Sequence, residues 1–349
     1  MYLVEFSVTR NSPKWVLNKE GVLTEFPVNT PAFMYDGYGV YKGVLSEKTK
    51  TNFCLNSQSF NSIWTGNVTT TVDPDVTLNN IDGATLFESP VSGISDEYGI
   101  SQNITVTSGG IHTASFFVKA GATNYIALKA SNYNTAGDTA YSIFDITTED
   151  INEETQEITI NAGFGNQQNL FSRKIEYCSN GWYRCSISFE IETGFTSCAF
   201  SVFLADSLTS IPISDESVFS FYGFGSQLEE GDRTSSYYPS GATAGVRDKD
   251  IITLDPATQY IPLEGEVIVS WYQPRSETLE IGDLITEIPE GDLTLRFVYT
   301  ATTQELYIND VLKTSSTGVY DWSGMTKIEL GHVNGFDQPD TNISLLVIK

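Results

Sequence analysis

The chain has 349 residues, of which 40% are hydrophobic and 18% are charged, and its formal net charge is -25. A charge this negative opposes the phosphate backbone of nucleic acids and anionic membrane surfaces, so we expect no nucleic-acid partner. No stretch of the sequence is long and apolar enough for a membrane span, so we expect no membrane insertion, and the length allows two domains with cores of their own.

The sequence predicts that residues 1–58 form a wrapping or attachment segment rather than a domain. The stretch 27–43 carries Pro, Gly and Asn at the density of a loop. The apolar run at the N-terminus is too short for a signal peptide, which predicts a chain made in the cytoplasm and used in soluble form. The aromatic residues of the segment follow no regular period and should need a partner surface to bury them. They include Phe6, Trp15, Phe26, Phe33 and Tyr35.

Residues 59–243 predict a β-sandwich. Runs of alternating apolar and polar residues recur along this region, and each run is bounded by turn residues, which is the pattern of a sandwich rather than of helices. The acidic run 149–154 predicts an exposed loop. The expected strands span 114–121, 124–131, 157–164, 182–189, 197–206 and 217–229.

The same pattern restarts in residues 250–349 and predicts a second β-sandwich. Small and polar residues at 237–250 indicate a linker between the two, and Asn309-Asp310 between apolar runs is a two-residue hairpin signal. The predicted fold class is therefore all-β, with little helix. The expected strands of this region span 266–274, 292–300, 304–310, 327–333 and 342–349.

The four cysteines and two histidines do not suggest a metal centre. No Cys-x-x-Cys pair occurs, which argues against a structural zinc site. Cys178 and Cys185 flank one hairpin turn, and whether they form a disulfide stays open. We expect no cofactor. A structural calcium ion is the alternative, although no loop of the EF-hand type supports it.

Five stretches, at 6–37, 43–60, 113–128, 179–189 and 222–242, together resemble one protein family. They include Thr-Arg at 9–10, Glu-x-x-x-Thr-Asn at 47–52, Gly-Trp-Tyr-Arg at 181–184, Gly-x-Gln-Leu-Glu at 225–229 and Ser-Tyr-x-Pro-Ser at 236–240. In this order they resemble tailed-bacteriophage virion proteins, usually tail fibres, that contain a carbohydrate-binding-module-like jelly roll. The last hundred residues more weakly resemble a concanavalin-like or laminin-G-like sandwich.

The resemblance implies a non-enzymatic structural protein of the virion. Such a protein would be a tail fibre or fibre-like appendage, assembled in the host cytoplasm and exposed on the particle surface. Its partners would be other virion proteins and host surface glycan, and such fibres are commonly homotrimers. A capsid decoration or head-fibre protein is the alternative within the virion. A carbohydrate-active enzyme with accessory binding modules is the alternative from another class.

Catalysis has little support in the sequence, and we name no catalytic residue. His112 and His332 lie at a turn and at an expected strand end, and no Gly-x-Ser-x-Gly, His-Glu-x-x-His or phosphate-binding loop occurs. With 44 Asp and Glu residues, a pair of glycosidase carboxylates is not excluded by counting. No such pair stands out by its local context.

Sugar binding has better support, because aromatic faces cover the apolar side of a pyranose while Arg, amides and hydroxyls bind its hydroxyl groups. Alternation places Tyr125 and Lys129 on the polar side of one strand, and Trp182 and Arg184 on the polar side of another. If the two strands are neighbours, they form one aromatic-studded polar face. The competing interpretation is structural, with Trp182 covering the sheet end and Arg184 paired to an acidic residue. The candidate glycan-binding residues are Tyr125, Tyr133, Tyr141, Trp182 and Arg184.

Overall fold

The computed structural model describes the greater part of the chain. Phe6 and the stretches predicted as a strand at 157–164 and as a loop at 149–154 lie outside the described residues. From residue 253 on, side chains are described only at residue 298 and within 303–317. The described ranges are 7–60, 63–90, 97–147, 170–208, 218–254, 265–273, 277–281, 284–288, 291–299, 303–317, 328–331 and 341–348.

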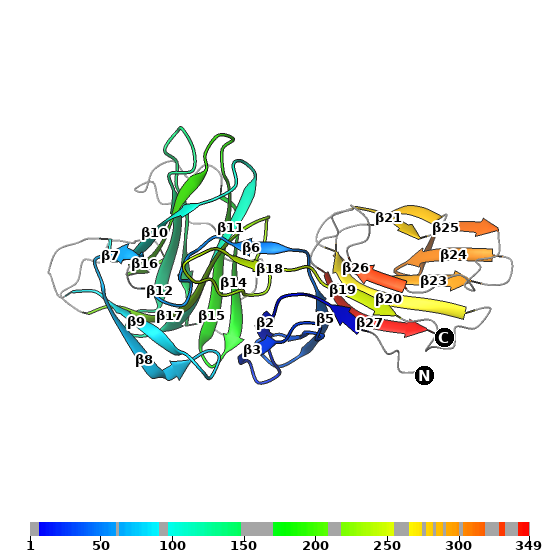
Figure 1. The fold of residues 1–349 in the computed structure, drawn as a ribbon, viewed down its shortest axis with the longest axis horizontal. Helices are drawn as coiled ribbons and strands as arrows, with labels where there is room; N and C mark the ends of the chain where they lie inside the picture. The colour runs from blue at the N-terminus through cyan, green and yellow to red at the C-terminus, as the bar shows by residue number, and fades with distance from the viewer. Residues whose placement is uncertain are drawn as a thin grey trace.

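The described residues contain strands and turns but no helix, so the fold is all-β as predicted. No helix there is long and apolar enough to cross a membrane. Figure 1 shows two β-rich lobes, with the blue N-terminal segment lying between them.

The first lobe is a sandwich of two antiparallel sheets. One sheet has five strands in the order β13-β12-β16-β10-β7, and the other has six in the order β14-β15-β11-β17-β9-β8. The five-stranded sheet comprises β7 (Thr65–Gly66), β10 (Gly99–Thr105), β12 (Tyr125–Ser131), β13 (Ala140–Asp145) and β16 (Ser197–Ala205). The six-stranded sheet comprises β8 (Thr69–Thr77), β9 (Gly83–Glu88), β11 (Ile111–Ala120), β14 (Leu170–Ser179), β15 (Trp182–Glu190) and β17 (Ser220–Glu230).

The strand order of this lobe is that of a jelly roll. Between β9 and β17 the chain crosses repeatedly from one sheet to the other, so that β9-β17-β11-β15 lie side by side in one sheet and β10-β16-β12-β13 in the other. Both sets pair strands that are remote in sequence, as two interlocked Greek keys require. The jelly-roll prediction is therefore confirmed by the topology itself.

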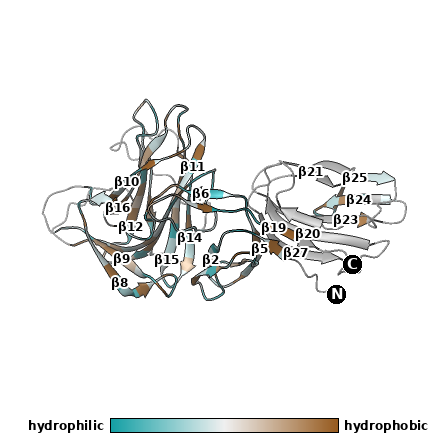
Figure 2. Cartoon of the chain, viewed as in Figure 1, coloured by the Kyte–Doolittle hydropathy of each residue, from teal (hydrophilic) through white to brown (hydrophobic). Residues whose placement is uncertain are grey.

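The core of the jelly roll lies between the two sheets and is rich in aromatic rings. The Phe87 and Phe221 rings stack at 4.9 Å, and Phe60 meets Phe116 at 5.2 Å and Trp64 at 5.4 Å. Figure 2 shows how the hydrophobic residues follow these strands. Trp64 in turn meets Phe200 of the five-stranded sheet at 6.3 Å, so this run of rings joins the two sheets. Truncating one such buried ring typically costs about 3–5 kcal/mol.

The second lobe draws on both ends of the chain. Its seven-stranded sheet has the order β25-β24-β23-β20-β27-β5-β4, and a three-stranded sheet β1-β19-β26 packs on it through Val8, Val44 and Ile252. A further hairpin is formed by β21 (Glu277–Ile281) and β22 (Leu284–Ile288). The strands from the N-terminal segment are β1 (Ser7–Thr9), β4 (Phe33–Tyr35) and β5 (Tyr41–Ser46). The others are β19 (Ile251–Leu254), β20 (Gly265–Gln273), β23 (Gly291–Tyr299), β24 (Thr303–Ile308), β25 (Val311–Thr317), β26 (Ile328–Gly331) and β27 (Thr341–Ile348).

The rest of the N-terminal segment lies against the jelly roll. Its hairpin of β2 (Lys14–Leu17) and β3 (Leu23–Phe26) turns through Gly21, which has a φ of 73°. A Cβ on Gly21 would lie 2.1 Å from the Cβ of Ser179 at the end of β14, so only glycine allows this approach. The segment predicted to wrap against a neighbour thus contacts the jelly roll and also supplies strands to the second lobe.

The stretch predicted as a linker is not a free tether. Within it, β18 (Gly245–Arg247) pairs with β6 (Lys50–Asn52) of the N-terminal segment. Tyr237, Arg247 and Asp250 are each at most 1% exposed. The stretch is therefore anchored at these buried residues, while the small residues at 241–244 remain exposed.

Candidate functional site

The outer face of the six-stranded sheet carries Trp182 and Arg184, and it is covered. The Trp182 side chain lies in an apolar cluster with Trp15 and Leu23 of the N-terminal hairpin and with Tyr237. Its indole N–H donates to the Thr77 carbonyl at 3.1 Å. A ring that is 1% exposed offers no face to a sugar, so the structure corrects the prediction that Trp182 binds glycan.

Arg184 is also buried, and its side chain binds other groups of the protein. Its guanidinium donates to the Ser235 carbonyl at 2.6 Å and to the Ser115 hydroxyl at 3.1 Å, and it lies 5.0 Å from the Phe117 ring centroid. Trp182 and Arg184 belong to β15, whereas Tyr125 belongs to β12 of the other sheet. The single polar face expected from these residues does not form, because the two strands lie in opposite layers of the sandwich.

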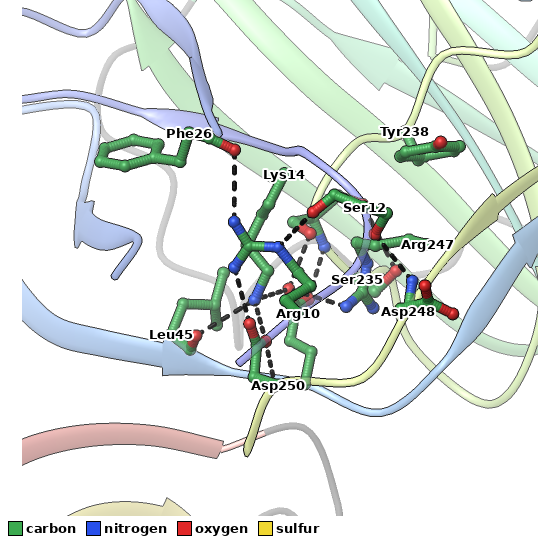
Figure 3. Close-up of polar contacts among 12 residues, drawn as sticks. Arg10, Ser12, Lys14, Phe26, Leu45, Ser235, Tyr238, Arg247, Asp248 and Asp250 are labelled. Atoms are coloured by element: carbon green, nitrogen blue, oxygen red, sulfur yellow. Dashed lines mark hydrogen bonds and ion pairs between the residues drawn. The ribbon is translucent and has the colours of Figure 1, made fainter. Parts of the chain in front are cut away.

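A buried polar network lies where the N-terminal segment meets the expected linker (Figure 3). The Arg10 guanidinium contacts the Asp250 carboxylate at 2.7 Å, and the Lys14 ammonium contacts Glu47 at 2.8 Å and also Asp250. Arg247 lies 3.4 Å from Glu47. All five side chains are at most 2% exposed, so three cations and two carboxylates are held together out of water.

The charges of this network stabilise one another. Burial raises the pKa of the Glu47 carboxyl, but the nearby Arg247 and Lys14 outweigh it and hold that pKa well below its usual range. Glu47 also accepts hydrogen bonds from the Ser236 backbone N–H at 2.6 Å and the Ser236 hydroxyl at 2.7 Å. Removing one member of such a set leaves a buried charge uncompensated, which makes the network a strong determinant of the fold.

The network continues on the jelly roll around Glu229. This carboxylate is fully buried and accepts from the Ser235 backbone N–H at 2.7 Å and the Ser235 hydroxyl at 2.6 Å. The Gln227 carbonyl oxygen accepts from the Tyr238 backbone N–H at 3.1 Å. The Asn52 side chain accepts from the Leu228 N–H at 3.1 Å. Polar strand β6, which Figure 2 shows in teal, is buried by these contacts.

The five sequence motifs therefore meet in space. Arg10 comes from the first motif, Glu47 from the second, Arg184 from the third, Glu229 from the fourth and Ser236 from the fifth. Glu47 binds Ser236 directly, while Arg184 and Glu229 bind opposite ends of Ser235. The sequence shows these motifs individually, but it does not indicate that their side chains form one buried network.

Tyr133 and Tyr141, the other two tyrosines among the candidate glycan-binding residues, are also buried. Tyr133 is 0% exposed and packs 5.2 Å from the Phe189 ring in the core, where burial raises the pKa of its hydroxyl. Tyr141 is 2% exposed and belongs to strand β13. Neither ring is available to stack on a sugar, so these two predictions are corrected as well.

Tyr125 is the predicted site residue that stays partly exposed, on the outer face of the five-stranded sheet. Phe203 lies one strand away, with its ring over Gly99, since a Cβ there would be 2.6 Å from the Phe203 Cδ1 atom. The Lys129 ammonium lies 5.6 Å from the centroid of the Phe203 ring and 3.4 Å from the Glu97 carboxylate.

Hydroxyl and amide groups complete this face. The register places Lys129, Ser201 and Ser101 in one row across β12, β16 and β10, and the Ser201 hydroxyl donates to Ser101 at 2.9 Å. Asn103 follows on the same side of β10 and is exposed. We call the partly exposed portion of this surface the open face, defined by Tyr125, Lys129, Phe203, Ser101 and Asn103. The rest of this side of the sheet is buried, at Ala127, Tyr141, Ile143 and Ala205. It offers ring surface together with donors and acceptors, which are the groups that bind sugars.

The cysteines and His112 are structural in this arrangement. All four cysteines are buried and unpaired, so Cys178 and Cys185 do not form a disulfide here. Burial raises the pKa of the Cys178 thiol to about 12. His112 is buried, within 3.2 Å of the Thr107 hydroxyl, and burial lowers its pKa. Over the described ranges, no group of three or more His, Cys, Asp or Glu side chains could hold a metal ion.

Comparisons with known proteins add little beyond this geometry. No protein-family model and no curated protein matches the chain. Among solved structures, the chain is similar to the N-terminal CBM22-1–CBM22-2 tandem domain of Xyn10C from Paenibacillus barcinonensis. The TM-score is 0.29 at 11% sequence identity, with 88% of this chain and 98% of that chain covered. The jelly-roll assignment rests on the strand order and does not depend on this likeness.

Proposed function

We propose that the protein is a non-enzymatic structural component of a tailed-bacteriophage particle, of the tail-fibre or fibre-like type, whose jelly roll contacts host surface glycan. One observation carries the proposal: the motifs on which the family resemblance rests are brought together in a single buried network. A chance similarity of short motifs would not place them in mutual contact. Their convergence supports a shared structural unit made of the N-terminal segment and the jelly roll.

The architecture suits a load-bearing part of a particle. The N-terminal segment contacts the jelly roll through its hairpin and joins the second lobe through three strands. The buried charges of Arg10, Lys14 and Asp250 tie these parts together. Buried pairs of this kind are far less screened by salt than surface pairs, so the connection between the lobes stays firm in varied surroundings.

The test is to locate the chain on particles. Antibodies raised against the purified protein are applied, with gold label, to particles produced by the genome that encodes it. Label at a tail or an appendage is the expected result. Label on the head would favour the capsid-decoration alternative, and particles without label would overturn the virion assignment.

The open face is the part that we propose contacts glycan. Purified protein should compete with particles for adsorption to host cells, and a Tyr125→Ala variant should compete less well because it lacks one stacking ring. The Lys174→Ala variant, altered at an exposed pair on the other sheet, serves as the control. Equal competition by Tyr125→Ala and the wild type would contradict glycan binding at this face.

A further inference from the structure

The hairpin of β4 and β5 carries a compact cluster of aromatic rings at the edge of the second lobe. The register places Phe33 opposite Val44 and Tyr35 opposite Tyr41, with Lys42 as the extra residue of a bulge. The Tyr41 ring lies 5.6 Å from that of Tyr35 and 6.4 Å from that of Phe33. We call Phe33, Tyr35 and Tyr41 the ring cluster.

Two of these rings, Phe33 and Tyr41, are more exposed than any aromatic side chain that sequence reasoning selected for sugar binding. Tyr41 is 48% exposed and Phe33 is 40% exposed. On the opposite side of the hairpin, Met34 packs with Leu45 against the N-terminal hairpin. The hairpin is thus anchored through Met34 and Leu45 on one side and through Val44 on the side that carries the rings, where Phe33 and Tyr41 remain exposed.

The turn that connects β4 and β5 is held in one conformation by the Asp36 side chain. Asp36 ends β4, and its carboxylate accepts hydrogen bonds from the N–H groups of Tyr38 at 3.0 Å and Val40 at 2.9 Å. The same carboxylate lies 3.1 Å from the Lys42 ammonium. A turn held by its own side chain loses little conformational freedom on binding, so the rings act as a prepared surface.

The rim of the ring cluster is polar but locally neutral. Asp36 and Lys42 compensate each other and remain 29% and 45% exposed at their side chains. Their oxygen and nitrogen atoms, with the tyrosine hydroxyls, can bind hydroxyl groups beside the rings. Rings that meet at interplanar angles of 46° and 60° form a corner, which suits the apolar face and edge of a pyranose.

We propose that the ring cluster is a carbohydrate-binding site for a neutral oligosaccharide, separate from the open face of the jelly roll. A second copy of the chain is a poorer occupant. Phe33 and Tyr41, each about half exposed, offer roughly 200 Å² on one chain, or about 400 Å² when a second copy buries the same patch. A stable protein interface buries at least about 1,000 Å² in total. The net charge of -25 also makes two copies repel each other, and a neutral glycan meets no such repulsion.

The site goes beyond the proposed function, because it gives one chain a second point of attachment. Two weak sites on one particle component raise the apparent affinity for a multivalent surface without any new contact. The ring cluster lies on the β4–β5 hairpin and the open face on the jelly roll, so substitutions separate the two sites.

The test uses the full-length chain and a panel of neutral hexasaccharides of glucose, galactose, mannose and N-acetylglucosamine, with affinities from calorimetry. The variant is Phe33→Ala with Tyr41→Ala. The matched control is Val311→Ala with Leu312→Ala, two apolar residues that are 55% and 49% exposed at the opposite edge of the same sheet. We expect the ring variant to weaken binding of at least one sugar about tenfold, with an unchanged melting temperature, and the control to bind as the wild type does.

Three outcomes would overturn the proposal. They are no binding of any panel member to the wild type, equal binding by the ring variant, or a wild-type oligomer in light scattering that the ring variant dissociates. The last would assign the rings to contacts between copies. Binding that persists in a Tyr125→Ala chain supports the ring cluster even if the open face binds no glycan. The gold-labelling result bears on the virion assignment alone.

Discussion

The two outer faces of the jelly roll begin from the same sequence pattern and end differently. Strand β15 alternates an inner set of apolar residues with Trp182 and Arg184, and strand β12 alternates an inner set with Tyr125 and Lys129. Trp182 lies under the N-terminal segment and Arg184 is buried by its contacts with Ser235 and Ser115, whereas the second pair remains partly exposed. Alternation therefore identifies which residues point outward from a sheet. Whether those residues are exposed to solvent depends on whether another part of the chain packs over them.

The largest effect should come from breaking the network beneath the covered face. Asp250→Ala leaves the buried Arg10 and Lys14 without their shared carboxylate. Removing one partner of a buried ion pair typically costs about 3–5 kcal/mol, so we expect a stability loss of that size in chemical denaturation.

The control for this variant is Lys174→Ala, because Lys174 and Glu176 form a pair whose side chains are 45% and 35% exposed. We expect a loss below about 1 kcal/mol there. If the two variants lose the same stability, the buried network does not have the role assigned to it. Should Asp250→Ala fail to fold, Asp250→Asn provides a milder measure of the same loss.

Truncating the covered ring should be nearly as disruptive. Trp182→Ala removes a fully buried side chain, which typically costs about 3–5 kcal/mol, and it also removes the indole hydrogen bond to Thr77. We expect the folded fraction to keep its glycan affinity, as judged by thermal unfolding and calorimetry on the same sample. Trp182→Phe should lose less stability. A Trp182→Ala protein of normal stability and weakened binding would reverse the assignment of the two faces.

Acid should destabilise the folded chain through Glu47 of the buried network and through His112. The pKa of Glu47 is lowered in the folded state, so its contribution to stability is present above the unfolded value of about 4.3 and is lost as the pH falls below it. His112 acts in the same sense, because its pKa is lowered by burial and the unfolded chain gains the proton first, from about pH 6.5 downward.

We therefore expect the melting temperature to decline from about pH 6.5 and more steeply below about pH 4.5. Glu47→Gln should flatten the lower part of this decline. A direct check is the carboxyl carbon shift of Glu47 in an NMR titration. A Glu47 that titrates near its ordinary value would contradict the account given for the network.

The smallest change in stability should come from the open face. Tyr125 is only partly buried, so Tyr125→Ala should cost roughly 1 kcal/mol or less. The same substitution should weaken the affinity for host glycan by about five- to tenfold, since a stacking ring is lost. Thermal unfolding measured beside glycan binding separates the two quantities. A large drop in melting temperature would place Tyr125 with the structural residues of the covered face.

The sequence predicted the strands better than it predicted the site. The alternation around Phe116 and Cys185 correctly indicates strands β11 and β15, since a buried face requires a period of two. The Asn309-Asp310 hairpin is confirmed, and both residues have positive φ values of 50° and 62°, as a two-residue turn of this type requires.

What covers a face could not be predicted from local pattern. Trp182 is covered by Trp15, a residue 167 positions earlier in the chain, and no short-range signal reports such a contact. Tyr133 was a candidate for glycan binding and lies in the core instead, because the segment between β12 and β13 packs it against Phe189. The ring cluster was missed because Phe33 and Tyr35 were considered only as residues that need a partner surface, a prediction that stays open, and Phe33 is exposed on the single chain.

The pairing of β5 with β27 has a consequence for how the chain is made. Thr341 lies opposite Ser46, so β5 must wait for a strand that is translated much later. With roughly 300 residues between them and synthesis at about 5–20 residues per second, the wait on the ribosome is about 15–60 s. During that time the jelly roll has been fully translated and can fold, while β5 still presents an unpaired edge. During this period the β4–β5 hairpin of the nascent protein lacks its partner strand β27, and the folded jelly roll is the structured part available to protect the exposed edge of β5.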